Sequence, residues 1–279
     1  GTPVERIETH ISWVLLAGDL AYKLKKPVRL PFLDFGSVAL RRHYCEEELR
    51  INRRLAPQLY LGLSRVTGSA DAPAFDGPGE ALDHAVRMRR FPVGALLAEQ
   101  ARAGRLDAPR VVRLATRIAA WQREAAAAPP DRGYGGAALH AMALNTLDGI
   151  ARQQPQRAGE IDALRGWFAQ QAGRLAPLWA ARAAGGQVRE GHGDLHLANL
   201  VELDGEILPF DAIEFDAALR FIDPVDDVAF TAMDLKAHGH ADLAARFTDA
   251  WVEASGDHAG LPLWRHALVY LSLIHISEP

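Results

Sequence analysis

The stretch that decides the fold lies in the last third of the chain. Residues 191–214 read Gly-His-Gly-Asp-Leu-His-Leu-Ala-Asn-Leu-Val-Glu-Leu-Asp-Gly-Glu-Ile-Leu-Pro-Phe-Asp-Ala-Ile-Glu. Two short apolar runs flank Asp204-Gly205, a dipeptide typical of the two-residue turn of a β-hairpin. The hairpin is predicted to return Asp211 to the side of Asp194 and Asn199, so that three oxygen-bearing side chains meet at one end of it.

These three side chains form the set that phosphoryl transfer needs. One carboxylate accepts the proton of the attacking hydroxyl, and an amide and a second carboxylate hold magnesium on the phosphates. Asn199 follows Asp194 with the spacing found in the catalytic loop of protein kinases. The pattern predicts a kinase-type site, although Asp194 or Asn199 taken alone also suits an ordinary turn or cap.

The rest of the chain changes character near Gly94. Before it, the sequence reads as short strands and one helix that Ser37 caps; after it, the sequence is mostly helical. Asp107 is predicted to cap a long helix that runs to Ala128. The order is a small β-rich lobe, a connector, and a larger helical lobe that contains the β-hairpin.

The chain resembles the aminoglycoside phosphotransferase family of kinase-like enzymes. The similarity rests on residues 192–199 and 210–214, and residues 11–27 and 45–57 extend it to nearly the whole chain. The last two segments are similar to a bacterial branch in which the kinase-like domain precedes a separate P-loop domain. No Gly-x₄-Gly-Lys-Ser/Thr motif occurs in the chain, so we expect that the P-loop domain is missing here and is a partner at most.

The resemblance implies an α+β, protein-kinase-like fold with two lobes. Residues 1–91 would form an N-lobe with a nucleotide-binding sheet and one main helix. Residues 92–279 would form a mostly helical C-lobe that contains the catalytic loop and the β-hairpin.

The resemblance also implies roles for residues of the C-lobe. Asp194 would be the catalytic base, and Asn199 and Asp211 would be the metal ligands. Four further residues would support them: His192 and His196 through hydrogen bonds that hold the loop, Glu214 beside the metal or a cationic substrate, and Asp227 from a neighbouring helix. A surface carboxylate is the alternative for Glu214.

In the N-lobe, Lys23 matches the lysine that contacts the α- and β-phosphates. Its carboxylate partner would be Glu48, with Glu47 as the alternative. Lys25 lies on the same strand face as Lys23 because side chains alternate along a strand, so the lysine assignment could shift by two residues. Met88 would line the adenine pocket.

The chain departs from the kinase pattern at two places. No Gly-x-Gly-x-x-Gly loop begins it, and residues 9–12 (Thr-His-Ile-Ser) occupy that turn. Hydroxyl groups such as that of Ser12 and backbone amides would therefore serve the phosphates. Trp121-Gln122 stands where the family often has Phe-His, which removes any role of that histidine.

Composition limits the possible classes further. With 279 residues, 49% of them hydrophobic and 24% charged, the chain is long enough for a large core, and its single cysteine excludes an internal disulfide. No apolar run approaches the ~18 residues that span a bilayer, and we expect a cytoplasmic protein without membrane partners. Residues 1–94 carry a net charge of +3 and residues 95–279 a net charge of −7, which argues against nucleic-acid binding.

The expected function is transfer of the γ-phosphoryl group of ATP, with GTP as an alternative donor and Mg²⁺ as cofactor, to a hydroxyl of a small molecule. Ten acidic residues between Asp194 and Asp227 suit a polycationic, aminoglycoside-like acceptor, or a solvated acidic surface. A nucleotide-sensing module without transfer activity is the second hypothesis. A metallohydrolase that uses the His-x-Asp-x-His pattern of residues 192–196 is the third.

The end of the chain has an unusual sequence. Residues 271–279 read Leu-Ser-Leu-Ile-His-Ile-Ser-Glu-Pro, which resembles a translated sequencing adaptor. We expect that the C-lobe is truncated there and that residues from about Leu273 onward pack poorly. A short natural C-terminus is the alternative.

Overall fold

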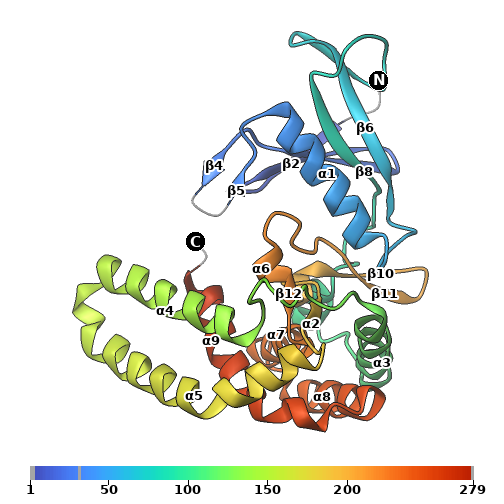
Figure 1. Ribbon diagram of the computed structural model, residues 1–279. Helices are drawn as coiled ribbons and strands as arrows, with labels where there is room; N and C mark the ends of the chain where they lie inside the picture. The colour runs from blue at the N-terminus through green and yellow to red at the C-terminus, as the bar shows by residue number, and fades with distance from the viewer. Residues whose placement is uncertain (1–3, 31–32, 278–279) are drawn as a thin grey trace. The chain divides into compact units, whose positions relative to one another are not determined.

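The computed structural model describes residues 4–30 and 33–277 (Figure 1). It divides into two compact units, and each is described by itself below. The sheet unit comprises Gly1–Leu96 with Asn199–Asp216, and the helical unit comprises Leu97–Ala198 with Ala217–Pro279.

A six-stranded sheet, antiparallel throughout, forms the frame of the sheet unit, with the strand order β1-β2-β3-β8-β6-β7. Its strands are β1 (Val4–Glu8), β2 (Ser12–Ala17), β3 (Leu20–Lys25), β6 (Tyr60–Ser69), β7 (Ala72–Phe75) and β8 (Asp83–Arg89). Gly18, at φ 57°, makes the tight turn between β2 and β3. Two short strands, β4 (Arg29–Leu30) and β5 (Leu33–Asp34), pair with each other.

The helix α1 (Val38–Asn52) packs against the sheet (Figure 1). Ser37 caps its N-terminus, because the Ser37 hydroxyl accepts a hydrogen bond of 3.2 Å from the Leu40 amide. Cys45 and Leu49 from this helix share an apolar core with Ala21 of β3 and Val86 of β8. The helix thereby presents Glu48 to the sheet.

The hairpin of β10 (Leu200–Leu203) and β11 (Glu206–Pro209) has the predicted turn, with φ of 52° at Asp204 and 81° at Gly205. The predicted place of this hairpin was the C-lobe. In the structure it belongs to the sheet unit, because its apolar side chains Val201, Leu203 and Leu208 join the core of that unit. The boundary between the lobes at residues 91 and 92 stays a prediction.

The helical unit consists of eight α-helices in the described part of the chain, with short 3₁₀ turns and one small sheet. The helices are α2 (Leu97–Arg102), α3 (Ala108–Glu124), α4 (Gly136–Gln153), α5 (Ala158–Ala184), α6 (Ala217–Arg220), α7 (Pro224–Ala237), α8 (Ala241–Ser255) and α9 (Trp264–Ser277). The 3₁₀ turns are η1 (Pro155–Arg157), η2 (Leu197–Asn199) and η3 (His258–Leu263), and β9 (Arg189–Glu190) pairs with β12 (Phe221–Ile222).

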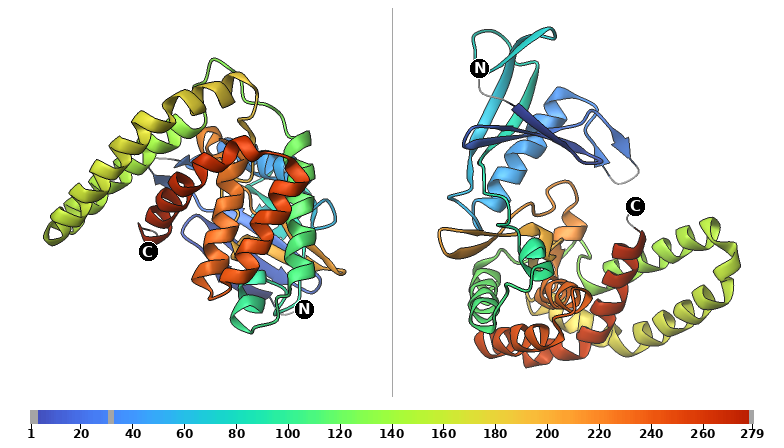
Figure 2. Two further views of the ribbon diagram at one scale, coloured as in Figure 1. Left: turned by 90° about the horizontal axis from the view of Figure 1, so that it is seen from below. Right: turned by 180° about the vertical axis from the view of Figure 1, so that it is seen from behind.

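The centre of the helical unit is α7, which packs against α8 and α9, while α3 packs against α8. Asp223 caps α7 and forms a capping box with Asp226. Figure 2 shows α4 and α5 as a long antiparallel pair that projects from the other helices of this unit. None of the described helices is both long enough and apolar enough to cross a membrane, and the cytoplasmic location stays a prediction.

One expectation for the helical unit was wrong, and another is contradicted at its first residue. The α3 helix ends at Glu124 rather than Ala128, because the Ala128 amide donates to Val188 and the Glu190 amide donates to Ala126. Leu273 is buried in α9 instead of packing poorly. The side chains that follow it lie outside the described residues.

Candidate functional site

The loop that carries Asp194 belongs to the helical unit and begins at Gly191. A side chain at Gly191 has no room, because a Cβ there would lie 2.6 Å from a carboxylate oxygen of Asp227. Gly193 has φ +84°, a conformation that glycine adopts without strain. The two glycines thus let the backbone bend closely around Asp227 on α7.

Asp227 holds the start of this loop by its backbone. Its two carboxylate oxygens accept hydrogen bonds from the amides of His192, at 2.8 Å, and Gly193, at 2.9 Å. Burial raises the pKa of Asp227 to about 6, although the two amides act in the opposite direction. Asp227 was expected on a helix next to the loop, and it lies on α7 and makes these two contacts.

The side chains of Asp194 and His196 lie on the more exposed side of the loop, while Leu195 and Leu197 are buried. The Nδ1 of His192 accepts from the Asp194 amide, and the Nδ1 of His196 accepts from the Ala198 amide, both at 3.2 Å. The neutral imidazole of His196 therefore carries its proton on Nε2. This atom lies 3.4 Å from a carboxylate oxygen of Asp194.

This geometry gives no support to a metallohydrolase. Both histidines of the His-x-Asp-x-His pattern use Nδ1 to accept a backbone hydrogen bond. Among the side chains of residues 4–30 and 33–273, no group of three or more His, Cys, Asp or Glu is arranged to hold a metal ion. Zinc sites of such enzymes need at least three such ligands.

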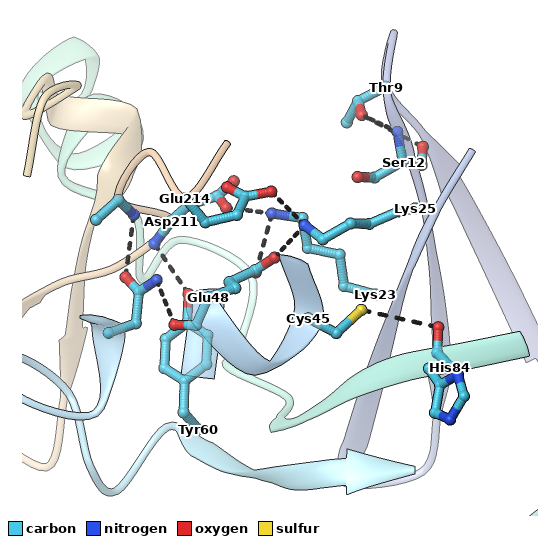
Figure 3. Close-up of polar contacts among 12 residues, drawn as sticks. Thr9, Ser12, Lys23, Lys25, Cys45, Glu48, Tyr60, His84, Asp211 and Glu214 are labelled. Atoms are coloured by element: carbon cyan, nitrogen blue, oxygen red, sulfur yellow. Dashed lines mark hydrogen bonds and ion pairs between the residues drawn. The ribbon is translucent and has the colours of Figure 1, made fainter. Parts of the chain in front are cut away.

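The sheet unit contains an ion network of Lys23, Lys25, Glu48, Asp211 and Glu214, which is buried except at Asp211 (Figure 3). The two lysines lie two residues apart on β3, so both point toward α1. The Nζ of Lys23 lies 3.0 Å from Oε1 of Glu48, and the Nζ of Lys25 lies 2.7 Å from its Oε2.

Each lysine of the ion network has a second carboxylate partner. Lys23 is paired with Asp211, and Lys25 is paired with Glu214. The alternative carboxylate, Glu47, forms an ion pair with Arg50 instead. The structure thus brings Lys23, Glu48 and Asp211 together and adds Lys25 with Glu214.

Burial and charge act against each other in the ion network. Burial disfavours the charge of Lys23 and Lys25, but the nearby carboxylates outweigh it and raise the pKa of both ammonium groups. Burial opposes the charge of Glu48 as well, yet the two lysines lower its pKa to about 2. Burial raises the pKa of Glu214, and the charge of Glu48 adds to that effect while Lys25 opposes it.

The backbone near Asp211 is held as firmly as its side chain. The Tyr60 hydroxyl accepts a hydrogen bond of 2.9 Å from the Asp211 amide (Figure 3). Oδ1 of Asn52 accepts one of 3.0 Å from the Ala212 amide. Asp211 has φ 62°, in the left-handed region that few residues other than glycine adopt. Sequence reasoning missed Asn52 and Tyr60; the only signal was that Asn52 lies one helical turn after Glu48.

Asn199 belongs to the same end of the hairpin as Asp211. Its carbonyl accepts a hydrogen bond of 3.0 Å from the Phe210 amide, which places it beside the strand end that leads to Asp211. The Asp211 side chain is 38% exposed despite its pairing with Lys23. Carboxylate and amide oxygens are ligands that Mg²⁺ prefers, so these two residues fit a magnesium site.

Ser12 and Met88 have contrasting surroundings. The Ser12 hydroxyl is buried and has no hydrogen-bond partner among the described residues. Hydrogen bonds between Thr9 and Ser12 fix the turn that precedes β2 (Figure 3). Met88 lies in the apolar core of the sheet unit, where β8 pairs it with Ala21 of β3.

Comparison with solved structures settles the fold. A choline/ethanolamine kinase family protein from Mesorhizobium loti superposes with a TM-score of 0.51 at 15% identity, over 99% of this chain and 80% of that chain. The ADP-bound aminoglycoside phosphotransferase APH(2'')-Ib superposes with a TM-score of 0.50 at 13% identity, over 98% and 85%. The chain has their kinase-like fold. The predicted α+β class and the predicted resemblance to aminoglycoside phosphotransferases are confirmed.

Sequence comparison finds relatives that are longer than this chain. Uncharacterized proteins of Mycobacterium tuberculosis and Mycobacterium bovis are 30% identical to it over 272 residues, which is 96% of this chain. The chain spans about half, 53%, of the length of these curated relatives. No family model matches the chain. A separate P-loop domain in the relatives stays a prediction.

Proposed function

We propose that this chain is an ATP-dependent phosphotransferase that moves the γ-phosphoryl group to a hydroxyl of a small molecule. The observation that carries the proposal is the Lys23–Glu48 ion pair, with Asp211 on the same ammonium group. In a kinase-like fold, a lysine on the third strand holds the phosphates, a helix carboxylate orients that lysine, and an aspartate holds the metal. The ion network contains all three.

The residues of the site divide the reaction between them. Lys23 would contact the α- and β-phosphates, and Asp211 and Asn199 would hold Mg²⁺, which neutralises charge that develops on the phosphates. Asp194 would accept the proton of the acceptor hydroxyl as the new bond between oxygen and the γ-phosphorus forms. The bond from the γ-phosphorus to the bridging oxygen breaks, and ADP leaves with that electron pair.

Two further residues would contact the nucleotide. The Ser12 hydroxyl is a free donor that can serve a phosphate oxygen in place of the absent glycine-rich loop. Met88 would contribute to the apolar surface that contacts the base. GTP is an alternative donor, since neither residue distinguishes the two bases.

We propose a cationic alcohol as the acceptor, with aminoglycosides as the first candidates. The ten acidic residues between Asp194 and Asp227 suit a cation. The structural neighbours are named for choline or ethanolamine and for aminoglycosides, and all of these compounds are cationic alcohols. This choice goes beyond the fold, which is compatible with many acceptors.

A transfer screen tests the proposal. The protein is incubated with Mg²⁺ and γ-labelled ATP and with aminoglycosides, choline, ethanolamine, other antibiotics or small metabolites, and labelled product is measured. We expect acceptor-dependent transfer that the Asp194→Asn variant lacks. ATP binding with no labelled product from any acceptor would favour the nucleotide-sensing module instead.

A matched pair of lysine variants tests the nucleotide assignment. Lys23→Ala should raise the KM for ATP strongly, whereas Lys26→Ala should have little effect, because Lys26 pairs with Glu8, 2.6 Å away, outside the ion network. Equal effects of Lys23→Ala, Lys25→Ala and Lys26→Ala would show that the lysines form only a charged strand end.

A further inference from the structure

One face of α7 touches the Asp194 loop at more points than Asp227 alone. Asp227, Thr231 and Asp234 are spaced by four and three residues, so they lie one above another on the same side of the helix. We call these three residues the α7 face. All three are buried.

The α7 face contacts the loop on both sides of Asp194. Asp227 accepts from the amides that precede Asp194, as described above. The Thr231 hydroxyl donates a hydrogen bond of 2.6 Å to the Leu195 carbonyl, and Oδ2 of Asp234 accepts one of 2.7 Å from the Leu197 amide. The backbone is therefore fixed before Asp194, directly after it, and again three residues after it.

These hydrogen bonds satisfy three backbone amides and one backbone carbonyl of the loop. The loop lies between β9 and η2, so residues 192–196 belong to no strand or helix. Buried backbone groups without a partner are costly, and a bond from an amide to a carboxylate is stronger than one to a neutral acceptor. The α7 face therefore determines the path of the loop.

The Asp234 carboxylate has a second contact besides the Leu197 amide. Its Oδ1 lies 3.2 Å from Nδ1 of His238, one helical turn further along. The same Nδ1 lies 2.9 Å from the Asp234 carbonyl. The Asp234 carboxylate is thus shared between the loop amide and the end of α7.

We propose that Thr231 and Asp234 are positioning residues for Asp194. They act on the loop backbone, and their loss lowers the rate of transfer while nucleotide binding is kept. The proposal rests on the proposed function for its kinetic readout. A base that moves by about 1 Å loses roughly 10²-fold in rate, because proton transfer depends on alignment.

The kinetic test compares Asp234→Ala with Asp234→Asn and Thr231→Val with Thr231→Ser. We expect a 10- to 100-fold lower kcat for Asp234→Ala and Thr231→Val, with the KM for ATP changed by less than about threefold. Asp234→Asn and Thr231→Ser keep an acceptor or a hydroxyl, so they should retain most of kcat. Lys236→Ala, on the exposed side of α7, is the matched control.

Hydrogen exchange tests the same proposal without activity. Amides of residues 192–199 should exchange faster in Asp234→Ala than in Lys236→Ala, while exchange in α3 stays the same in both. If wild type transfers no phosphoryl group, the proposed function fails and this measurement alone decides the positioning role. Should Asp234→Ala not fold, Thr231→Val carries both tests, since it keeps the side-chain volume.

Any of three results would overturn the proposal. One is a folded Asp234→Ala variant with unchanged exchange in residues 192–199. The second is a kcat within twofold of wild type in both Asp234→Ala and Thr231→Val, and the third is an equal loss in Asp234→Ala and Asp234→Asn.

Discussion

The ion network of the sheet unit and the α7 face of the helical unit hold their charged residues in different ways. In the sheet unit, the ion network joins side chain to side chain, with Glu48 between two ammonium groups. In the helical unit, the α7 face joins side chain to backbone, with carboxylates that accept from loop amides. The ion network requires full charges of opposite sign, whereas an amide can be satisfied by any oxygen of suitable position.

This difference sets how each part should respond to substitution. Removing one charge from a buried ion pair leaves its partner charged in a low-dielectric interior, which lowers the free energy of unfolding by about 3–5 kcal/mol. Replacing a carboxylate by a carboxamide at a backbone contact keeps one acceptor oxygen and costs about 1–2 kcal/mol. Under the proposed function, the ion network would contact the nucleotide and the loop would carry the catalytic base, so substitutions in the two should affect different steps.

The largest expected effect is on the rate. Asp194→Asn should lower transfer by roughly 10²–10⁴-fold, because a positioned base supplies that factor. The affinity for ATP should stay within a few-fold, since the ion network is unchanged. Single-turnover kinetics and a nucleotide-binding titration measure the two quantities. Near-normal turnover in the folded variant would show that Asp194 is not the catalytic base.

The next effect concerns stability and compares Glu48→Gln with Asp227→Asn. Glu48→Gln should lower the free energy of unfolding by about 3–5 kcal/mol, since two buried lysines lose the carboxylate they share. Asp227→Asn should cost less, about 1–3 kcal/mol, because one of the two loop amides keeps its acceptor and the other loses it. Urea unfolding monitored by circular dichroism measures both. Equal losses would break the distinction between the ion network and the α7 face.

The magnesium requirement should separate two residues of the hairpin. Asp211→Ala and Asn199→Ala should both raise the magnesium concentration for half-maximal transfer, and Asp211→Ala should do so more strongly, since it removes a full charge. Asp204→Ala is the control, because Asp204 lies in the same hairpin and pairs with Arg89. If the magnesium dependence were unchanged in either site variant, the metal site would not lie at this hairpin.

The smallest expected effect is a difference in acid sensitivity. Burial, with a smaller contribution from His140, lowers the pKa of His266 to about 4. The unfolded chain protonates this group near its ordinary value of 6.5, so its contribution to stability is lost as pH falls from about 6.5 to about 4. Glu48, with a pKa of about 2 against 4.5, loses its contribution only below about pH 4.5.

His266→Phe isolates this effect, which we expect to be about 1–3 kcal/mol between pH 6.5 and pH 4. Wild type should lose that much more unfolding free energy than the variant over this range. The difference between the two proteins is the relevant quantity, because the raised pKa of Asp227 acts in the opposite sense in both. Parallel curves would show that His266 is not held neutral by its surroundings.

Local features of the site could be predicted from the sequence alone. The turn at Asp204-Gly205 adopts the expected positive φ values, because few residues other than glycine, asparagine and aspartate take that conformation without strain. Ser37 caps its helix as expected. The pairing of Lys23 with Glu48 also followed from the sequence, but through resemblance to a family rather than from spacing.

The contacts that the sequence did not predict join residues far apart in the chain. Thr231 and Asp234 contact a loop more than thirty residues before them, and no local pattern marks them as different from other polar helix residues. Glu214 was left open between a metal, a substrate and the surface, and the structure pairs it with Lys25.

The sequence by itself determined the elements, the turn and the types of residue at the candidate site, because each depends on the preferences of neighbouring residues. Tertiary structure decided which charges are buried together, where α3 ends and which unit the hairpin joins. These outcomes depend on pairing and burial between distant segments. The hairpin joins the sheet unit because Val201, Leu203 and Leu208 bury their side chains there, and it carries Asp211 with it to Lys23.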